Sequence, residues 1–144
     1  MIHLEPITED NWREALSVSE EQKRYVASPM VLLARAYAYR GSRSCACMIC
    51  RDETPVGMAL YYGCPERNAY IFSQLFIDSR YQRRGYGRAA AELILERMRA
   101  QRTFPKVALC YVAGNVEAKS LYTGLGFSHT GEIDEDEIVM ELNL

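Results

Sequence analysis

The chain has no hydrophobic run long enough to cross a membrane. Its longest apolar stretch, PMVLLA at positions 29–34, ends at Arg35, whereas a membrane-spanning helix needs about 20 apolar residues. The first residues also differ from a secretory leader, because Glu5, Glu9 and Asp10 interrupt them. We therefore expect a cytoplasmic protein that makes no contact with a membrane.

Cysteine is too scarce, and odd in number, to predict a disulfide framework. There are five cysteines in 144 residues, and a chain of this length buries its own core without such links. Cys47 and Cys50 form a C-x-x-C pattern, but strand alternation places them on opposite faces and no second ligand pair follows. The two histidines, His3 and His129, lie singly on strand patterns. We expect reduced thiols and no metal site.

Repeats and low-complexity segments are also absent. Apolar residues make up 49 % and charged residues 25 % of the chain, which is the balance of an ordinary globular protein and not of a disordered or fibrous one. At 144 residues the length favours a single domain with one core, spanning residues 1–144.

The charges that are present are segregated along the chain, although the net charge is only −2. Residues 1–22 hold six acids against Arg13 alone, and residues 130–144 hold six acids and no base, so the middle carries an excess of nine positive charges. Such a chain can offer an anion a basic centre and a cation acidic flanks. The alternative for each charge is a solvated face or turn; for the Asp134–Glu137 run we favour a hairpin turn.

Hydrophobic periodicity and turn residues predict the order of the elements. A short strand at 2–6 precedes three helical pieces at 9–18, 19–29 and 30–41. Three strands at 44–51, 55–63 and 68–78, a long helix at 85–102, a strand at 106–112 buried on both sides, a helix at 115–124 and strands at 126–133 and 136–144 complete the chain.

This order predicts an α+β fold. The strands before and after the long helix should lie parallel through a right-handed crossover, while the others can be antiparallel. The result is a mixed central sheet of about seven strands with helices on both faces.

The loop between the third of those strands and the long helix has the features of an anion site. The first N–H groups of a helix have no partner and carry a partial positive charge. Gly85 and Gly87 open the backbone there, and Arg83, Arg84 and Arg88 add charged donors. Because each helix-end interaction contributes only about 0.3–1 kcal/mol, several donors must act together, which favours a diphosphate. The alternative is that the glycines merely punctuate a loop with solvated arginines.

Two known phosphate-binding patterns do not fit this loop. The pattern G-x-x-x-x-G-K-[ST] of nucleotide hydrolases is absent. The dinucleotide pattern G-x-G-x-x-[GA] is matched by Gly85 to Ala90, but the acid expected about 20 residues later is missing, and the glycines come eight residues after Ile77 instead of in a tight turn.

A second group of residues follows in the segment from Asn115 to Phe127. Ala118, Leu121, Tyr122 and Leu125 have the spacing of one helical face. Taken alone, this pattern is that of a packed amphipathic helix, with Tyr122 in the core.

Together the two segments resemble the GCN5-related N-acetyltransferases, which transfer acetyl from acetyl-coenzyme A to an amine. The first matches the family's Q/R-x-x-G-x-G/A loop through Gln82, Gly85 and Gly87. The second matches through Asn115, Ala118, Leu121, Tyr122, Leu125, Gly126 and Phe127. The resemblance extends along the whole chain in the order of its elements.

The resemblance implies a role for each matched position. Backbone groups of Leu75, Phe76 and Ile77 would bind the pantetheine arm of acetyl-coenzyme A. The loop, comprising Gln82, Arg83, Arg84, Gly85, Tyr86, Gly87 and Arg88, would hold the pyrophosphate on its N–H groups. Asn115 would bond the cofactor arm, and Tyr122 would protonate the departing thiolate, since a tyrosine is protonated at neutral pH.

The general base remains unassigned. Many members of the family carry a glutamate on the strand before the loop, whereas this strand offers only Tyr70, Ser73 and Gln74. Deprotonation of the amine would therefore run through ordered water or a carboxylate elsewhere.

The acceptor is predicted to be a small-molecule amine, with a polyamine such as spermidine or spermine favoured. The segments LEPITEDNW and EEQKRYVASP are similar to the N-terminal part of bacterial spermine/spermidine acetyltransferases, and acidic flanks attract a polyamine. The alternatives are a protein N-terminus or lysine, an antibiotic amine, or a non-catalytic acyl-coenzyme A sensor. No nucleic-acid partner is expected, because the net charge is negative. Exposed strand edges are compatible with a homodimer.

Overall fold

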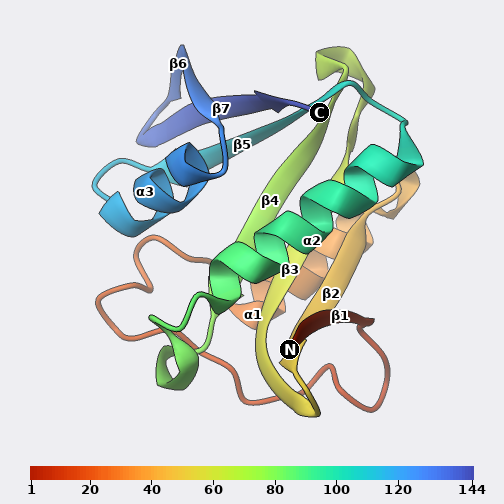
Figure 1. Cartoon of the computed structure of the whole chain (residues 1–144), viewed down its shortest axis with the longest axis vertical. Coiled ribbons are helices and arrows are strands. Elements are labelled where there is room, and N and C mark those ends of the chain that lie inside the picture. Colours follow the sequence, from red (N-terminus) through yellow and green to blue (C-terminus); the bar gives the residue numbers. More distant parts are fainter.

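The computed structural model describes all residues, 1–144, and contains seven strands and three α-helices. Figure 1 shows their arrangement. In chain order they are β1 (Ile2–Pro6), α1 (Pro29–Ala38), β2 (Cys45–Arg51), β3 (Thr54–Cys64), β4 (Ala69–Ile77), α2 (Tyr86–Gln101), β5 (Lys106–Val112), α3 (Val116–Gly124), β6 (Ser128–Asp134) and β7 (Glu137–Asn143).

The strands form one mixed sheet in the order β1-β2-β3-β4-β5-β7-β6. All neighbours are antiparallel except β4 and β5, which are parallel and joined by α2. The predicted α+β class, the mixed sheet and the parallel crossover around the long helix are therefore confirmed.

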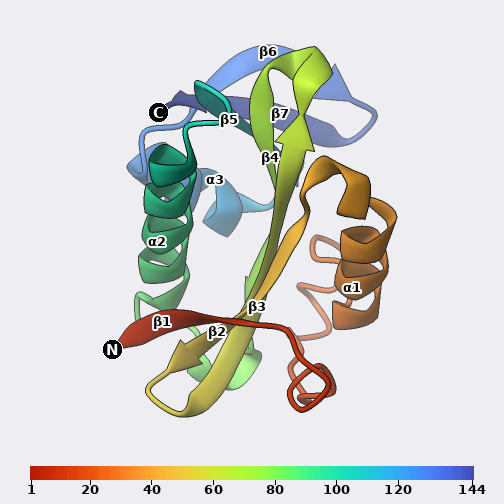
Figure 2. The same ribbon diagram turned by 90° about the vertical axis from the view of Figure 1, so that its right-hand side faces the viewer.

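Helices cover both faces of the sheet, as Figure 2 shows, with α1 on one side and α2 and α3 on the other. The buried stripe of α2, from Ala90 to Met98, packs on the larger apolar cluster, which includes Tyr61, Tyr70 and Phe72. A smaller cluster lies under α1 around Leu32 and Leu60. The two clusters also separate Cys47 from Cys50, so these thiols lie on opposite faces, as predicted.

The helices predicted at 9–18 and 19–29 are wrong. The segment from Ile7 to Ser28 consists of turns and irregular backbone without a helix. Of the predicted apolar face only Leu16 is buried, while Trp12 is 41 % exposed. A short helix gains most of its stability from packing such a face. Here the backbone instead bonds to distant residues, for example Ser17 to Asp78 and Ser79.

The prediction that β5 is buried on both sides holds for only part of the strand. Val107, Leu109 and Tyr111 face the core, and Ala108 on the opposite face is also buried, whereas Cys110 on that face is exposed. Figure 2 shows the reason, since α1 covers the part of the sheet around β2 and β3 and does not extend over β5.

No helix in the structure is both long enough and apolar enough to span a bilayer.

Asp78 anchors the segment of turns to the end of β4. It is 2 % exposed, and its carboxylate accepts hydrogen bonds from the N–H groups of Ser17 and Arg80 and from the Arg80 guanidinium at 2.8 Å. Burial alone would raise the pKa of Asp78, but these hydrogen bonds outweigh it and hold the pKa below its usual value.

We expect Asp78→Ala to lower the free energy of unfolding by about 1–3 kcal/mol at neutral pH, because two partly buried N–H groups lose their charged acceptor. Because the pKa of Asp78 is lower in the folded than in the unfolded protein, its carboxylate stabilises the fold at pH values above the pKa in the unfolded chain, about 3.9 for aspartate. This stabilisation is lost as the pH falls through the pKa in the folded protein. The difference in the free energy of unfolding between wild type and the Asp78→Ala variant, measured by urea unfolding, should therefore become smaller below about pH 4.

Asp52→Asn is the matched control, because Asp52 is exposed, its carboxylate pairs only with the chain's amino terminus, and asparagine tolerates the left-handed backbone at this position (φ +52°). We expect it to change stability by less than about 0.5 kcal/mol. Equal effects of the two substitutions would contradict the anchoring role of Asp78.

Candidate active site

The sheet opens between β4 and β5. The two strands pair only through Tyr70 with Val107 and Ile71 with Ala108, and beyond these pairs they diverge (Figure 1). The half of β4 from Phe72 to Ile77 therefore keeps β3 on one side and exposes backbone N–H and C=O groups on the other. An extended chain can add to such an edge by main-chain hydrogen bonds.

A β-bulge lies in β4 where the divergence begins. Leu60 pairs with Gln74 and Tyr61 pairs with Phe72, so Ser73 is an extra residue in β4. A bulge bends its strand and breaks the alternation of side chains. Gln74 then shares a face with Leu60, which belongs to the cluster under α1, and Ser73 Oγ meets Arg35 of α1 at 3.3 Å. Two consecutive polar side chains of β4 thus face α1.

The loop before α2 presents free N–H groups. Gly85 adopts the left-handed conformation with φ +81°, no side chain caps the helix, and the first intrahelical bond is from Ala89 to Gly85. The N–H groups of residues 83–88 consequently make no hydrogen bond within the protein. Arg83 is also left-handed, with φ +62°. Adjacent residues of alternating backbone conformation turn successive N–H groups inward, which suits an anion.

The three arginines of this loop differ in their partners. Arg83 pairs with Glu117 at 3.5 Å. The Arg88 guanidinium binds Glu92 at 3.0 Å and donates to the Gly124 carbonyl at 3.3 Å, so it joins α2 to the end of α3. Arg84 is exposed and forms no ion pair. The side chain of Arg88 is therefore engaged in packing, while its N–H remains free.

One cavity of about 680 Å³ joins the predicted site residues. Its lining includes eleven of the twelve positions predicted from the sequence: Leu75, Phe76, Ile77, Gln82, Arg83, Gly85, Tyr86, Gly87, Arg88, Asn115 and Tyr122. Arg84 alone does not line it. The open edge of β4, the loop of residues 82–88 that leads into α2 (the mouth of α2) and the start of α3 thus line the same cavity.

Gln82 shapes this cavity through its side chain. Its Nε2 donates to the Ile77 carbonyl at 2.8 Å, and its amide exchanges hydrogen bonds with Gln22 at 3.0 and 3.1 Å. These bonds hold the loop before α2 against both the end of β4 and the segment of turns. The Gln82 side chain therefore acts on the loop's geometry.

Asn115 begins α3. Its Oδ1 accepts a hydrogen bond from the Ala118 N–H at 3.2 Å, which caps the helix. The Nδ2 group makes no hydrogen bond within the protein, so it can donate to a molecule in the cavity.

Tyr122 lies one to two turns further along α3, on its buried face. Its ring makes edge contacts with Phe72 and Phe127, at centroid distances of 6.0 and 5.6 Å, and the residue is 9 % exposed. The hydroxyl makes no hydrogen bond within the protein, although it belongs to a residue that lines the cavity. Burial raises the pKa of Tyr122 above its usual value, so the hydroxyl keeps its proton at neutral pH.

The polar side chains of β4 provide no general base. The Tyr70 hydroxyl is bonded to the Met98 carbonyl and the Thr103 N–H, far from the open half of the strand. Ser73 is held by Arg35. The Oε1 of Gln74 is buried without a hydrogen-bond partner, and an amide cannot take up a proton at neutral pH.

The acidic residues of the flanks fall into paired and unpaired groups. Arg67 pairs with Glu132 at 2.6 Å and with Glu141 at 2.9 Å, while Glu20 pairs with Lys23. The Asp134–Glu137 run forms the exposed hairpin turn between β6 and β7, as predicted. Glu21 and Glu117 are the carboxylates that line the cavity.

Sequence reasoning missed the segment that covers the cavity. Residues 18–26 contribute seven lining side chains, which are Val18, Ser19, Glu21, Gln22, Arg24, Tyr25 and Val26. This segment contacts residues that are distant in the sequence. Gln22 bonds to Gln82, and Tyr25 Oη lies 3.2 Å from the position that a Cβ on Gly114 would take. No local pattern marks these contacts.

A group of possible metal ligands lies elsewhere. His3, Glu5 and Cys50 place one ligand atom each within 4.8 Å of one another, at the edge of the sheet formed by β1 and β2. None of them lines the cavity, and the hydrogen bond between His3 and Glu5 at 3.0 Å accounts for that contact.

Comparison with known proteins agrees with this geometry. The model of the acetyltransferase (GNAT) family matches residues 4–127. A spermine/spermidine N(1)-acetyltransferase of Bacillus subtilis is 28 % identical over 152 aligned residues, covering 98 % of this chain and 99 % of the relative.

Solved structures share the fold. The spermidine N-acetyltransferase of Vibrio cholerae in complex with CoA and spermine superposes with a TM-score of 0.78 at 16 % identity, covering 99 % of this chain and 95 % of that one. The ribosomal-protein-S18-alanine N-acetyltransferase of Escherichia coli superposes with a TM-score of 0.73 at 21 % identity, covering 99 % of this chain and 94 % of that one.

The splayed sheet and the helix mouth are those of an acyltransferase, and the chain belongs to the acetyltransferase (GNAT) family. Within that family it is an N-acetyltransferase that depends on acetyl-coenzyme A.

Proposed function

We propose that this protein, as a single acetyltransferase domain of residues 1–144, transfers acetyl from acetyl-coenzyme A to a primary amine of a small molecule, and that a polyamine is the favoured acceptor. The observation that carries the proposal is that one cavity joins the free N–H groups before α2, the open edge of β4 and Tyr122.

The residues of the cavity fit the parts of the cofactor. Consecutive free N–H groups and the cradle of Gly85 and Gly87 suit a pyrophosphate. The backbone of Leu75, Phe76 and Ile77, which has no strand on the side opposite β3, suits the amide groups of a pantetheine arm. The Nδ2 of Asn115 supplies a further donor from α3.

Acetyl-coenzyme A supplies a thioester whose carbonyl an amine attacks and whose sulfur leaves as a thiolate. In our proposal Tyr122 gives its proton to that sulfur, because its hydroxyl has no competing partner and remains protonated. A free N–H of the open half of β4 polarises the carbonyl. The proton of the amine passes to water, since β4 offers Gln74 where a base would be needed.

Three observations support a polyamine. Glu21 lines the cavity and has no ion-pair partner, so it can bind a second ammonium group. The relative from Bacillus subtilis is named as a spermine/spermidine acetyltransferase, and the Vibrio cholerae structure contains spermine. The fold is shared with an enzyme named for the ribosomal protein S18, which keeps a protein N-terminus as the second candidate.

The test is a thiol-release assay with acetyl-coenzyme A and a panel of acceptors: spermine, spermidine, butylamine, free amino acids and a peptide with N-terminal alanine. We expect kcat/KM for spermidine to exceed that for butylamine by more than about tenfold, equivalent to 1.4 kcal/mol. A preference for the peptide would reject the polyamine as the acceptor. Binding of acetyl-coenzyme A with no thiol released in the presence of any acceptor would indicate a sensor.

The contribution of Glu21 can be measured in the same assay. Glu21→Gln should raise KM for spermidine by about 3- to 10-fold and leave KM for butylamine unchanged, because only the polyamine has a second ammonium to bind. Glu20→Gln is the control, since Glu20 pairs with Lys23 and does not line the cavity. Equal effects of the two substitutions would remove Glu21 from the acceptor site.

A further inference from the structure

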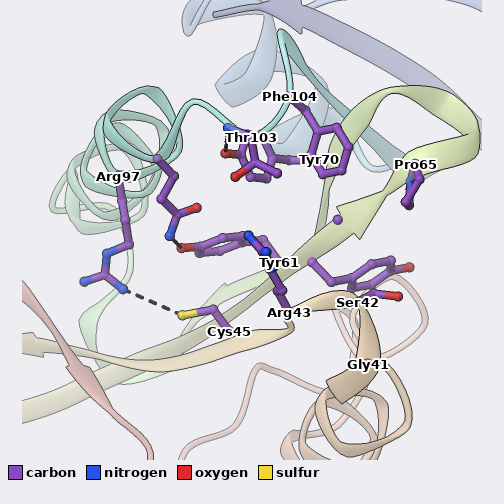
Figure 3. A pocket seen from close by; sticks show the side chains of 13 residues that line it. Gly41, Ser42, Arg43, Cys45, Tyr61, Pro65, Tyr70, Arg97, Thr103 and Phe104 are labelled. Atoms are coloured by element: carbon purple, nitrogen blue, oxygen red, sulfur yellow. Dashed lines mark hydrogen bonds between the residues drawn. The ribbon is translucent and has the colours of Figure 1, made fainter.

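A second cavity lies at the far end of α2. Its volume is about 630 Å³, and it is formed by the turn at 41–43, the start of β2, the adjoining ends of β3 and β4, and the end of α2 with the residues that follow it (Figure 3). It shares no residue with the cavity at the mouth of α2. Because α2 has 16 residues, its two ends are about 24 Å apart, so the two cavities are separate sites.

Aromatic side chains make the walls of this second cavity. Tyr61, Tyr62, Tyr70 and Phe104 all line it. The Tyr70 hydroxyl donates to the Met98 carbonyl at 3.2 Å and accepts from the Thr103 N–H at 3.0 Å, and the Phe104 ring meets the Tyr70 ring edge-on at 5.3 Å. Gln101 donates to the Tyr61 hydroxyl at 3.3 Å. These bonds hold the rings in place before any ligand binds.

The charge in the cavity is positive and unpaired. Arg43 and Arg97 line it, and no aspartate or glutamate does. Arg97 is half-buried, and its hydrogen-bond partner is the weak acceptor Cys45 Sγ, at 3.7 Å. Arg43 makes no hydrogen bond or ion pair. By contrast, Arg67, Arg80 and Arg88 each bind a carboxylate.

We propose that this cavity is a second ligand site and that it takes a small aromatic carboxylate. The guanidinium of Arg97 matches a carboxylate with two parallel N–H donors, and the tyrosine and phenylalanine rings receive the aromatic body. The volume is in the range of sites that enclose a small organic ligand. Figure 3 shows Arg97 extending from α2 toward Cys45 on one side of Tyr61, with Tyr70 and Phe104 on the other side.

The site borders the point where the sheet opens. Tyr70 belongs to one of the two residue pairs that join β4 to β5 before the strands diverge. A ligand held against Tyr70 therefore contacts the fixed end of the open edge, at a distance from the proposed acetyl-transfer site. The inference does not depend on that site's activity, and it is tested by binding alone.

The experiment measures binding of benzoate, phenylacetate and 3-phenylpropionate to the full chain by calorimetry and by chemical-shift changes of backbone amides. We expect at least one acid to bind with a Kd of about 1 mM or tighter, and to shift the amides of Gln101 and Thr103. Its alcohol and amine counterparts should bind at least about tenfold more weakly, because they lack the anion for Arg97.

Arg97→Gln should weaken binding of the acid at least about tenfold, whereas Arg99→Gln, on the exposed face of the same helix, should leave it unchanged. Saturating coenzyme A should not compete.

Three results would overturn the proposal: no acid binds, Arg97→Gln binds as tightly as wild type, or coenzyme A displaces the acid. The last result would place the acid in the cavity at the mouth of α2 instead.

Discussion

The Gly87→Glu substitution is expected to abolish binding of coenzyme A while leaving the fold intact. Gly87 lines the cavity at the mouth of α2, and a Cβ there would meet only Ile77 Cγ1, at an ordinary distance of 3.6 Å. The rest of a glutamate side chain would therefore extend into the space proposed for the pyrophosphate. The new carboxylate would lie beside the pyrophosphate, and such a pair of like charges costs several kcal/mol. We therefore expect the affinity for coenzyme A to fall by more than about 100-fold.

Gly87→Ala is the matched control, because it adds the Cβ without the carboxylate. We expect its affinity for coenzyme A, measured by calorimetry, to stay within a few-fold of wild type. The melting temperatures of both variants report whether the helix still forms. Retention of wild-type affinity by the Gly87→Glu variant would refute the assignment of the pyrophosphate to this loop.

The Tyr122→Phe substitution is expected to lower kcat by about 10²- to 10⁴-fold, the usual contribution of a general acid. A phenyl ring keeps the edge contacts with Phe72 and Phe127. Because the hydroxyl has no hydrogen-bond partner in the protein, its removal leaves no buried group unpaired. Affinity for coenzyme A and the melting temperature should therefore remain at their wild-type values.

Tyr111→Phe is the control for this experiment, since Tyr111 is buried and lies outside the cavity. Its hydroxyl bonds His129 at 2.7 Å, so we expect a small loss of stability and an unchanged kcat. Wild-type turnover in the Tyr122→Phe variant would remove Tyr122 from the chemistry.

The pH dependence of turnover gives a second check on Tyr122. Burial raises its pKa above the ordinary tyrosine value of about 10, so the acid form persists on the alkaline side. We therefore expect kcat of the wild type to show no decline attributable to this group below about pH 10.

The arrangement of the elements was predictable because most of them carry a strong local signal. The stripe of α2, from Ala90 to Met98, has helical periodicity and is buried as predicted. The strand Lys106–Val112 was predicted with its observed bounds. The helices predicted between 9 and 29 did not form for the opposite reason. The segment has helical periodicity, but it buries only Leu16 fully, and Val18 and Val26 pack against the core only in part. Local propensity does not decide such a segment when side chains elsewhere compete for its backbone.

The site was predictable only in part. The motif residues were found because glycines before a helix and a tyrosine on an apolar stripe are local features. The partners of the arginines were not, since Arg88 binds the Gly124 carbonyl from another helix. The buried Oε1 of Gln74 depends in turn on the bulge at Ser73, which is a matter of register between two strands.

By itself, then, the sequence determined the class of fold, the helix mouth with its glycines, and the position of Tyr122 on the buried face of α3. Each of these follows from residues that are neighbours in the chain or lie on one helical face. Tertiary structure alone decided that β4 and β5 part after Ile71, that residues 18–26 cover the cavity, and that Arg97 meets an aromatic cavity without a counter-ion. These features depend on pairing and packing between segments far apart in sequence, where no local pattern records the contact.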